Sequence, residues 1–390
     1  MLRKLRLGIA SALVVALAAT VGASAQSGNV ITIGYTGPLS GGAAQYGADV
    51  QRGIQMAIDE INGSGGVTVG GQKRTFRLAS LDDQYRPNEA ATNGKRLAQQ
   101  ENAPIIFCPH SGGILALMGF NDAQAPKFIV GAYSSEPSIL KQNDPLILMI
   151  PPSYASYFRP YADLEMKRFG KRLGLVPTTT AYGNGWTKGF SEVWQSMGGT
   201  VLGNNGVDYN TTADFSAPVS KALSEKPDVL FIGGPSQPTA LVIKTARDQG
   251  FTGGFVTMDQ AKFDQMDQVV PMARLEGSVG ILPFRQSTGP GLKTFIDAYT
   301  KKFGKDREPN PEIGNNYMAM HIFARAIALA NSVDPAAIEG KLDAAARALP
   351  KNQQPVAVRG VLKSGHLEEE VFSAVIDHGA FKTLRIPAME

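Results

Sequence analysis

Residues 30–66 read VITIGYTGPLSGGAAQYGADVQRGIQMAIDEINGSGG. Val30 to Gly34 is a short β-branched run closed by a glycine, which predicts a buried strand. Apolar residues then recur at the spacing of one helix face, at Val50, Ile54, Ala57, Ile58 and Ile61. The glycine-rich run 62–66 ends that helix. A buried strand followed by a long amphipathic helix is the start of a βαβ unit, from which parallel sheets are built.

The same alternation continues along the chain and restarts after Pro151-Pro152, which is a turn signal. Further strands are expected at 76–81, 104–108, 127–132, 173–176, 200–207, 228–232 and 254–258. The tail reads differently, as antiparallel hairpins over 356–362, 371–376 and 381–386. Because 390 residues exceed what one core of roughly 250–300 residues supports, we expect two lobes. The predicted fold class is α/β, with a central parallel sheet in each Rossmann-like lobe.

The N-terminus has the pattern of an export signal. Arg3, Lys4 and Arg6 precede an uncharged apolar run at 7–21 and small residues at 23–25, which predicts a secretory signal peptide over 1–25. A membrane anchor is the alternative, but spanning needs about 20 apolar residues. The only cysteine, Cys108, does not follow the apolar run, so we expect a periplasmic protein without a lipid anchor.

Charge and motifs exclude several classes of function. Removal of the signal peptide takes three positive charges with it, so the formal net charge falls from +4 to +1, and no cluster of basic and aromatic residues suggests a nucleic-acid partner. The sequence contains no G-x-S-x-G, Walker A or H-E-x-x-H motif, and its four histidines are far apart. We therefore expect a protein that is not an enzyme and that binds neither a metal nor a cofactor. Cys108 and His110 are interpreted as structural.

Small polar residues follow the predicted strands, where an open parallel sheet binds ligands. The first lobe offers Ser111-Gly112 at the start of a helix and Tyr133-Ser134-Ser135 after a strand. Hydroxyls and free N–H groups at a helix start suit a carboxylate. The second lobe offers Tyr182, Ser236 and Asp259 at equivalent positions. An acid opposite a carboxylate site suits the ammonium of a zwitterion. For Ser111 and Ser135 the alternative is helix N-capping, and for Asp259 a cap or a solvated position.

At these residues the chain resembles a known family, the periplasmic solute-binding proteins of ABC importers for branched-chain amino acids. The resemblance covers essentially the whole chain after the signal peptide. Its motifs are Ile33-Gly34, Gly37-Pro38-Leu39-Ser40-Gly41, Ala44-Gln45-Tyr46-Gly47, 53–62, Gly65-Gly66, Asp82-Asp83 with Pro87, Tyr182-Gly183 and Phe231-Ile232-Gly233-Gly234. The resemblance implies the type I periplasmic binding fold, in which three segments form a hinge between the lobes.

The resemblance also implies roles for individual residues. The α-carboxylate would be held by Ser111 (or the Gly112 backbone) and Ser135, with backbone groups from Tyr133. Asp259 stands where the family usually has a glutamate that binds the α-ammonium. Three tyrosines complete the implied site: Tyr46 lines it, Tyr182 closes over the ligand, and Tyr317 is a further pocket aromatic, with core or hinge packing as its alternative role.

The predicted molecule captures its ligand by closing a hinge. Lobe 1 is expected at 26–149 plus 285–352 and lobe 2 at 150–284 plus 353–390, with crossings near Pro151, Pro283 and Pro355. The implied partners are a small-molecule ligand and an ABC permease in the membrane, and the protein itself is expected to be a monomer outside the membrane. An amino acid of branched-chain type is the expected ligand. The alternatives are an aromatic or other carboxylic acid, or a small amide.

Overall fold

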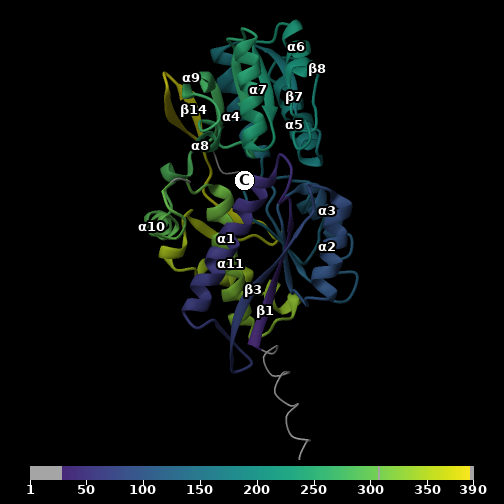
Figure 1. Ribbon diagram of the computed structural model, residues 1–390, viewed down its shortest axis with the longest axis vertical. Helices are drawn as coiled ribbons and strands as arrows, with labels where there is room; N and C mark the ends of the chain where they lie inside the picture. Colours follow the sequence, from purple (N-terminus) through teal and green to yellow (C-terminus); the bar gives the residue numbers. More distant parts are fainter. Residues whose placement is uncertain (1–28, 306–307, 387–390) are drawn as a thin grey trace, which may run out of the picture.

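The computed structural model describes residues 29–305 and 308–386. The predicted signal peptide, 1–25, lies outside the described residues. Two lobes are stacked along the long axis of the molecule (Figure 1). The lower lobe contains β1, α1 and α11, and the upper lobe contains β7, α5 and α7 (Figure 1). Each lobe is built on its own sheet, which is parallel over most of its width.

The sheet of lobe 1 has the strand order β2-β3-β1-β4-β5-β6. Only the β2–β3 pair is antiparallel. Its strands are β1 Val30–Gly37, β2 Val67–Val69, β3 Gln72–Asp82, β4 Ile105–Cys108, β5 Ile129–Ala132 and β6 Ile147–Met149. The helices of this lobe are α1 Ala44–Gly63, α2 Pro87–Gln99, α3 Ser111–Met118, α10 Leu292–Phe303, α11 Pro311–Ala330, α12 Pro335–Glu339 and α13 Leu342–Arg347.

The sheet of lobe 2 has the order β15-β14-β11-β10-β9-β7-β8. Its strands are β7 Arg172–Pro177, β8 Thr200–Asn204, β9 Val229–Gly233, β10 Gly254–Thr257, β11 Ser278–Ile281, β14 Phe372–Asp377 and β15 Ala380–Arg385. The last two form an antiparallel hairpin at the edge, as the tail pattern predicted. The helices are α4 Ala155–Arg168, α5 Ala181–Ser196, α6 Ser216–Ser224, α7 Ser236–Asp248, α8 Phe263–Met266 and α9 Met272–Leu275.

Apolar side chains lie on both faces of each sheet, because helices pack against both faces and bury the strands. In lobe 1, one cluster joins β1 to α1 and α11, and another joins β4 to α2 and α3. Helices α1 and α11 pack so closely that a Cβ on Gly53 would come within 2.2 Å of the carbonyl oxygen of Ile313. In lobe 2, one cluster contains the aromatic residues of α4 and α5 and the other lies under α6 and α7.

The chain crosses between the lobes three times. The crossings lie between β6 and α4, between β11 and α10, and between β13 and β14. The third crossing differs from the sequence prediction, which placed it near Pro355 and assigned 353–390 to lobe 2. The hairpin of β12 Val358–Val361 and β13 Leu367–Glu369 packs on lobe 1, where His366 pairs with Met149 and Leu367 joins the core. The chain therefore enters lobe 2 only after Glu369.

Candidate functional site

The cleft between the lobes lies at the carboxyl ends of the parallel strands, as the general rule for open α/β sheets predicts. It contains a pocket with about 320 Å³ of empty space, part of which is open to solvent. Both lobes contribute to its wall, which is formed by Tyr46, Tyr85, Pro109, His110, Ser111, Tyr133, Ser134, Ser135, Pro151, Tyr182, Asp259, Gln260, Lys262 and Glu312.

The lobe 1 wall is built from the turns after β4 and β5. The N-cap of α3 is His110, whose Nδ1 accepts from the backbone N–H of Gly113 at 3.0 Å. Its Nε2 lies 3.0 Å from Asp83 Oδ2, so the neutral imidazole with its proton on Nε2 satisfies both contacts. Because His110 is the cap, the hydroxyl of Ser111 is not used for capping and instead pairs with Ser134 Oγ at 2.7 Å.

Tyr46 forms the floor of the lobe 1 wall. Its hydroxyl donates to the carbonyl of Pro109 at 2.7 Å and lies 3.3 Å from that of Tyr133, and burial raises the pKa of its phenol well above the usual value. The next residue, Gly47, has to be a glycine, because a Cβ there would lie 1.8 Å from the carbonyl oxygen of Pro38. The motif Ala44-Gln45-Tyr46-Gly47 therefore brings the start of α1 against two strand-end turns.

The lobe 2 wall fixes the carboxylate of Asp259, which follows β10. The hydroxyl of Tyr182 donates to Asp259 Oδ1 and accepts from the backbone N–H of Gln260 at 3.1 Å. Trp186 Nε1 also donates to Asp259 Oδ1, at 3.1 Å. Burial, together with the charge of Asp259, raises the pKa of Tyr182 well above its usual value, so the hydroxyl stays a donor. Both donors use Oδ1, and neither uses Oδ2.

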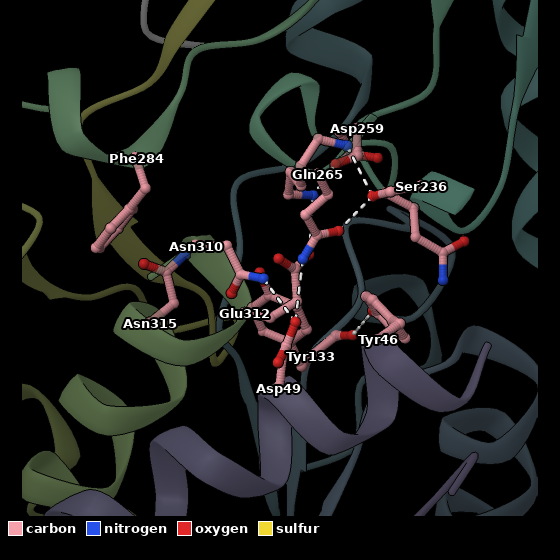
Figure 2. A network of polar contacts seen from close by, with 12 residues as sticks. Tyr46, Asp49, Tyr133, Ser236, Asp259, Gln265, Phe284, Asn310, Glu312 and Asn315 are labelled. Atoms are coloured by element: carbon pink, nitrogen blue, oxygen red, sulfur yellow. Dashed lines mark hydrogen bonds and ion pairs between the residues drawn. The ribbon is translucent and has the colours of Figure 1, made fainter. Parts of the chain in front are cut away.

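A cross-cleft network joins the lobes beside this cavity (Figure 2). It has two branches. In the first, Gln265 Nε2 of lobe 2 donates at 3.0 Å to Asp49 Oδ2 on α1, which also accepts from Asn310 Nδ2 at 2.8 Å. In the second, Lys262 Nζ lies 2.9 Å from Glu312 Oε1 on α11. Ser236 ties the two branches together on the lobe 2 side, by donating to Gln265 Oε1 and accepting from the N–H of Lys262.

The Lys262–Glu312 ion pair is almost completely buried, with side-chain exposures of 6% and 1%. Burial raises the pKa of Glu312, and the charge of Lys262 opposes that rise. Two residues of the cavity wall make another cross-cleft contact, in which Gln260 Nε2 donates to Tyr85 Oη at 3.2 Å. Outside the cavity wall, the N–H of Gly42 in lobe 1 donates to the carbonyl of Asn210 in lobe 2 at 3.0 Å. The two lobes are thus in direct contact around the cavity.

The structure brings together most of the residues predicted for the site. Those that line the cavity are Tyr46, Ser111, Tyr133, Ser134, Ser135, Tyr182 and Asp259. Three predicted residues lie elsewhere. Gly112 faces Pro87, Ser236 supports the loop after β10, and Tyr317 packs in the core with its hydroxyl donating to Glu60 Oε2 at 2.6 Å. Tyr317 therefore has the packing role that was its alternative.

Apart from two prolines, five wall residues were missed by the prediction: Tyr85, His110, Gln260, Lys262 and Glu312. Gln260 and Lys262 follow the same strand as Asp259, so the rule that located Asp259 could have included them. His110 stands directly before the predicted Ser111. No local sequence signal marks Tyr85 or Glu312, because both reach the cavity through the docking of distant elements.

Comparison with known proteins decides the family. A family model described as periplasmic binding protein matches residues 30–379. This chain belongs to the periplasmic binding protein family. The Leu/Ile/Val-binding protein homolog 8 of Brucella abortus is 25% identical over 344 residues, which cover 83% of this chain and 82% of that protein. The Leu/Ile/Val-binding protein BraC3 of Rhizobium johnstonii is 28% identical over 219 residues, which are 56% of this chain and 58% of BraC3.

Solved structures share the fold of this periplasmic binding protein. The leucine binding protein LivK of Thermotoga maritima superposes with a TM-score of 0.76 at 24% identity, covering 91% of this chain and 97% of that chain. LivJ of Streptococcus pneumoniae, in complex with isoleucine, gives a TM-score of 0.74 at 19% identity and covers 92% of this chain and 100% of that chain. The resemblance inferred from the sequence is therefore confirmed, as is the two-lobed α/β fold.

The family membership makes this chain a binding protein rather than an enzyme. Among the helices in the described ranges, none has both the length and the apolar character needed to cross a bilayer.

Proposed function

We propose that this protein is the substrate-binding component of an ABC importer. It would be exported through a cleaved signal peptide over 1–25 and act as a free monomer in the periplasm. There it would capture an amino acid, with a branched-chain amino acid as the expected type, and deliver it to a membrane permease. The relatives named as Leu/Ile/Val-binding proteins support this role.

The observation that carries the proposal is the polarity of the two cavity walls. Lobe 1 presents the paired hydroxyls of Ser111 and Ser134 at the start of α3, where N–H groups and the helix dipole favour a carboxylate. Lobe 2 presents the carboxylate of Asp259, oriented by two donors on α5. A zwitterion placed between the walls would meet an anion site on one side and a cation site on the other.

The proposed mechanism is capture by closure. The ligand's carboxylate binds lobe 1 first. Closure then brings Tyr182 and Asp259 onto the ligand and excludes water, which strengthens the polar contacts. Only a ligand that binds the closed form better than the open form can drive this equilibrium. The permease would recognise the closed form through both lobes.

The alternative ligand class has no amine, and comprises aromatic or other carboxylic acids and small amides. Such a ligand would use the lobe 1 hydroxyls but would gain nothing from the charge of Asp259. The two classes therefore differ in how strongly their binding depends on that one carboxylate.

The test is Asp259→Asn, measured by titration calorimetry with leucine, isoleucine and 4-methylpentanoic acid, which is leucine without its amine. Loss of a charged hydrogen-bond acceptor should cost about 2 kcal/mol, or roughly thirtyfold in affinity for the amino acids, with little change for the amine-free acid. Asp267→Asn is the matched control, since Asp267 is exposed and lies outside the cavity. Equal amino-acid affinities of wild type and Asp259→Asn would rule out the zwitterion model.

A further inference from the structure

A second cavity continues from the first toward the hinge. Its empty space amounts to about 590 Å³, part of which is open to solvent, and it shares the wall residues Tyr133, Pro151, Asp259 and Lys262 with the first cavity. All three interlobe crossings contribute to it, through Pro152, through 281–287, and through 369–372. We call this space the hinge-side cavity. A ligand held between the two walls described above would have its side chain free to extend into it.

The wall of the hinge-side cavity combines apolar residues with a polar pair, which we call its polar end. Ile281, Leu282, Phe284, Val356 and Phe372 supply its apolar surface. Asn315 on α11 and Glu369 at the end of β13 form the polar end, where Asn315 Nδ2 donates to Glu369 Oε1 at 3.3 Å. Figure 2 shows Asn315 below Phe284, to one side of the cross-cleft network. This arrangement suits an aliphatic chain that ends in a polar group.

The polar end has two hydrogen-bond acceptors that lack a donor. Asn315 is 4% exposed, and its Oδ1 has no hydrogen-bond partner among the described residues. Glu369 Oε2 is likewise buried, with no partner in the described part of the chain. Burial raises the pKa of the Glu369 carboxyl to about 8, and the hydrogen bond from Asn315 opposes that rise. Buried acceptors are normally paired, so this end of the cavity is built for a group with N–H donors.

The charges around the two cavities also favour a cation. Their walls contain Asp259, Glu312, Glu369 and Glu370, whereas Lys262 is the one lysine or arginine among the described wall residues. Lys262 is already paired with Glu312. Glu370 lies 3.5 Å from Arg359, which is outside these walls. Asp259 would serve the α-ammonium of the ligand. The Glu369 carboxyl, with its pKa of about 8, is mostly protonated at neutral pH in the empty cavity, and a cation beside it would favour its charged form.

We infer that the hinge-side cavity is a specificity subsite for the cationic end of a basic amino acid, an ammonium or guanidinium group on an unbranched aliphatic chain. The cation would donate to Glu369 Oε2 and Asn315 Oδ1 while its methylene groups contact the apolar wall. The inference rests on the proposed amino-acid-binding function and replaces its expected branched-chain ligand by a basic amino acid. Leucine and isoleucine would leave both acceptors unpaired.

Titration calorimetry on the full mature chain tests this with lysine, arginine, norleucine and leucine. Norleucine is the decisive comparison, because it has the aliphatic chain of lysine and lacks the terminal amine. Wild type should bind lysine or arginine at least tenfold more tightly than norleucine. Glu369→Gln should reduce that preference to less than threefold by weakening the binding of the basic amino acids. Glu368→Gln is the matched control, because Glu368 lies outside both cavities and its replacement should preserve the preference.

The outcomes separate this inference from the proposed function. If norleucine or leucine binds as tightly as both basic amino acids, the subsite is overturned while amino-acid binding stands. The subsite is also overturned if Glu369→Gln keeps the full preference for basic amino acids over norleucine. That result would mean that the cation does not contact Glu369 and that water occupies this end of the cavity. If no amino acid binds, both fail. Because the wild-type ligand series alone can overturn the subsite, the test does not depend on the variant folding.

Discussion

Lys262→Met should open the molecule and weaken ligand binding. Lys262 belongs to lobe 2 and Glu312 to lobe 1, and the 2.9 Å contact between them exists only while the lobes are in contact. Methionine has nearly the length of lysine but no charge, so the substitution removes the ion pair with little change in packing. In the closed form Glu312 would then be a buried carboxylate without its cation.

The size of the effect follows from the contact. At 2.9 Å and an effective dielectric constant of about 20, the attraction is about 6 kcal/mol. Desolvation of both groups offsets most of that attraction, so the intact pair contributes little net energy to closure. Removing one partner from a buried pair nevertheless costs about 3–5 kcal/mol. Glu312 can escape part of this cost by taking up a proton, which leaves about 2–4 kcal/mol against closure, or roughly 30- to 1,000-fold in affinity.

The assay is calorimetry with the tightest amino-acid ligand of the series, together with the radius of gyration from small-angle X-ray scattering. Lys262→Met should bind more weakly and show a larger radius at the same ligand concentration. Lys262→Met/Glu312→Leu should recover affinity, because apolar residues of similar volume replace a buried pair without loss. Lys293→Met is the control, since Lys293 is 88% exposed. Wild-type affinity and radius in Lys262→Met would refute the reasoning.

Two further predictions concern stability. Gly53→Ala should lower the free energy of unfolding in urea by about 1–3 kcal/mol, because the new Cβ would meet the Ile313 carbonyl oxygen at 2.2 Å. Gly63→Ala, at the open end of the same helix, is the control and should change the free energy of unfolding by less than about 1 kcal/mol. Equal effects of the two substitutions would contradict this packing argument. Burial raises the pKa of Glu165 to about 8 from 4.5, so this carboxyl favours the fold fully below pH 4.5 and loses that contribution as the pH rises through 8. Glu165→Gln removes this titration, so its melting temperature should fall less between pH 6 and 9 than that of the wild type. The difference should correspond to at least about 1 kcal/mol in the free energy of unfolding, and parallel curves would contradict the burial argument.

The strands were largely predictable from the sequence because their signal is local. The run at 30–34 predicted β1, and the expected strands at 104–108 and 228–232 correspond to β4 and β9. Helix α4 gave no such signal. Its buried residues include Tyr157, Phe158 and Tyr161, and Pro160 interrupts the pattern inside the helix. An aromatic stripe with a proline is a weak helix pattern, and α4 forms because α5 and the sheet cover that stripe.

Site residues were predictable where a strand end determines their position. Asp259 and Ser111 follow from that rule, whereas Glu312 does not, because its role depends on how lobe 2 docks. Tyr317 shows the limit of a motif within a helix. Successive residues of a helix point in different directions, so Asn315 reaches the hinge-side cavity while Tyr317, two positions later, faces Glu60 on α1.

In the proposed mechanism, ligand binding and lobe closure would be coupled through one short segment, the loop after β10 together with α8. Asp259 lines the ligand cavity and contacts Tyr182, Gln260 contacts Tyr85, Lys262 contacts Glu312, and Gln265 contacts Asp49. The last three contacts cross the cleft, and Ser236 holds the loop through Gln265 and Lys262. A ligand that repositions Asp259 would shift residues that make cross-cleft contacts. A variant in this loop that altered affinity should therefore alter closure as well, whereas a lobe 1 variant such as Ser111→Ala should reduce affinity and leave the apo closure equilibrium unchanged.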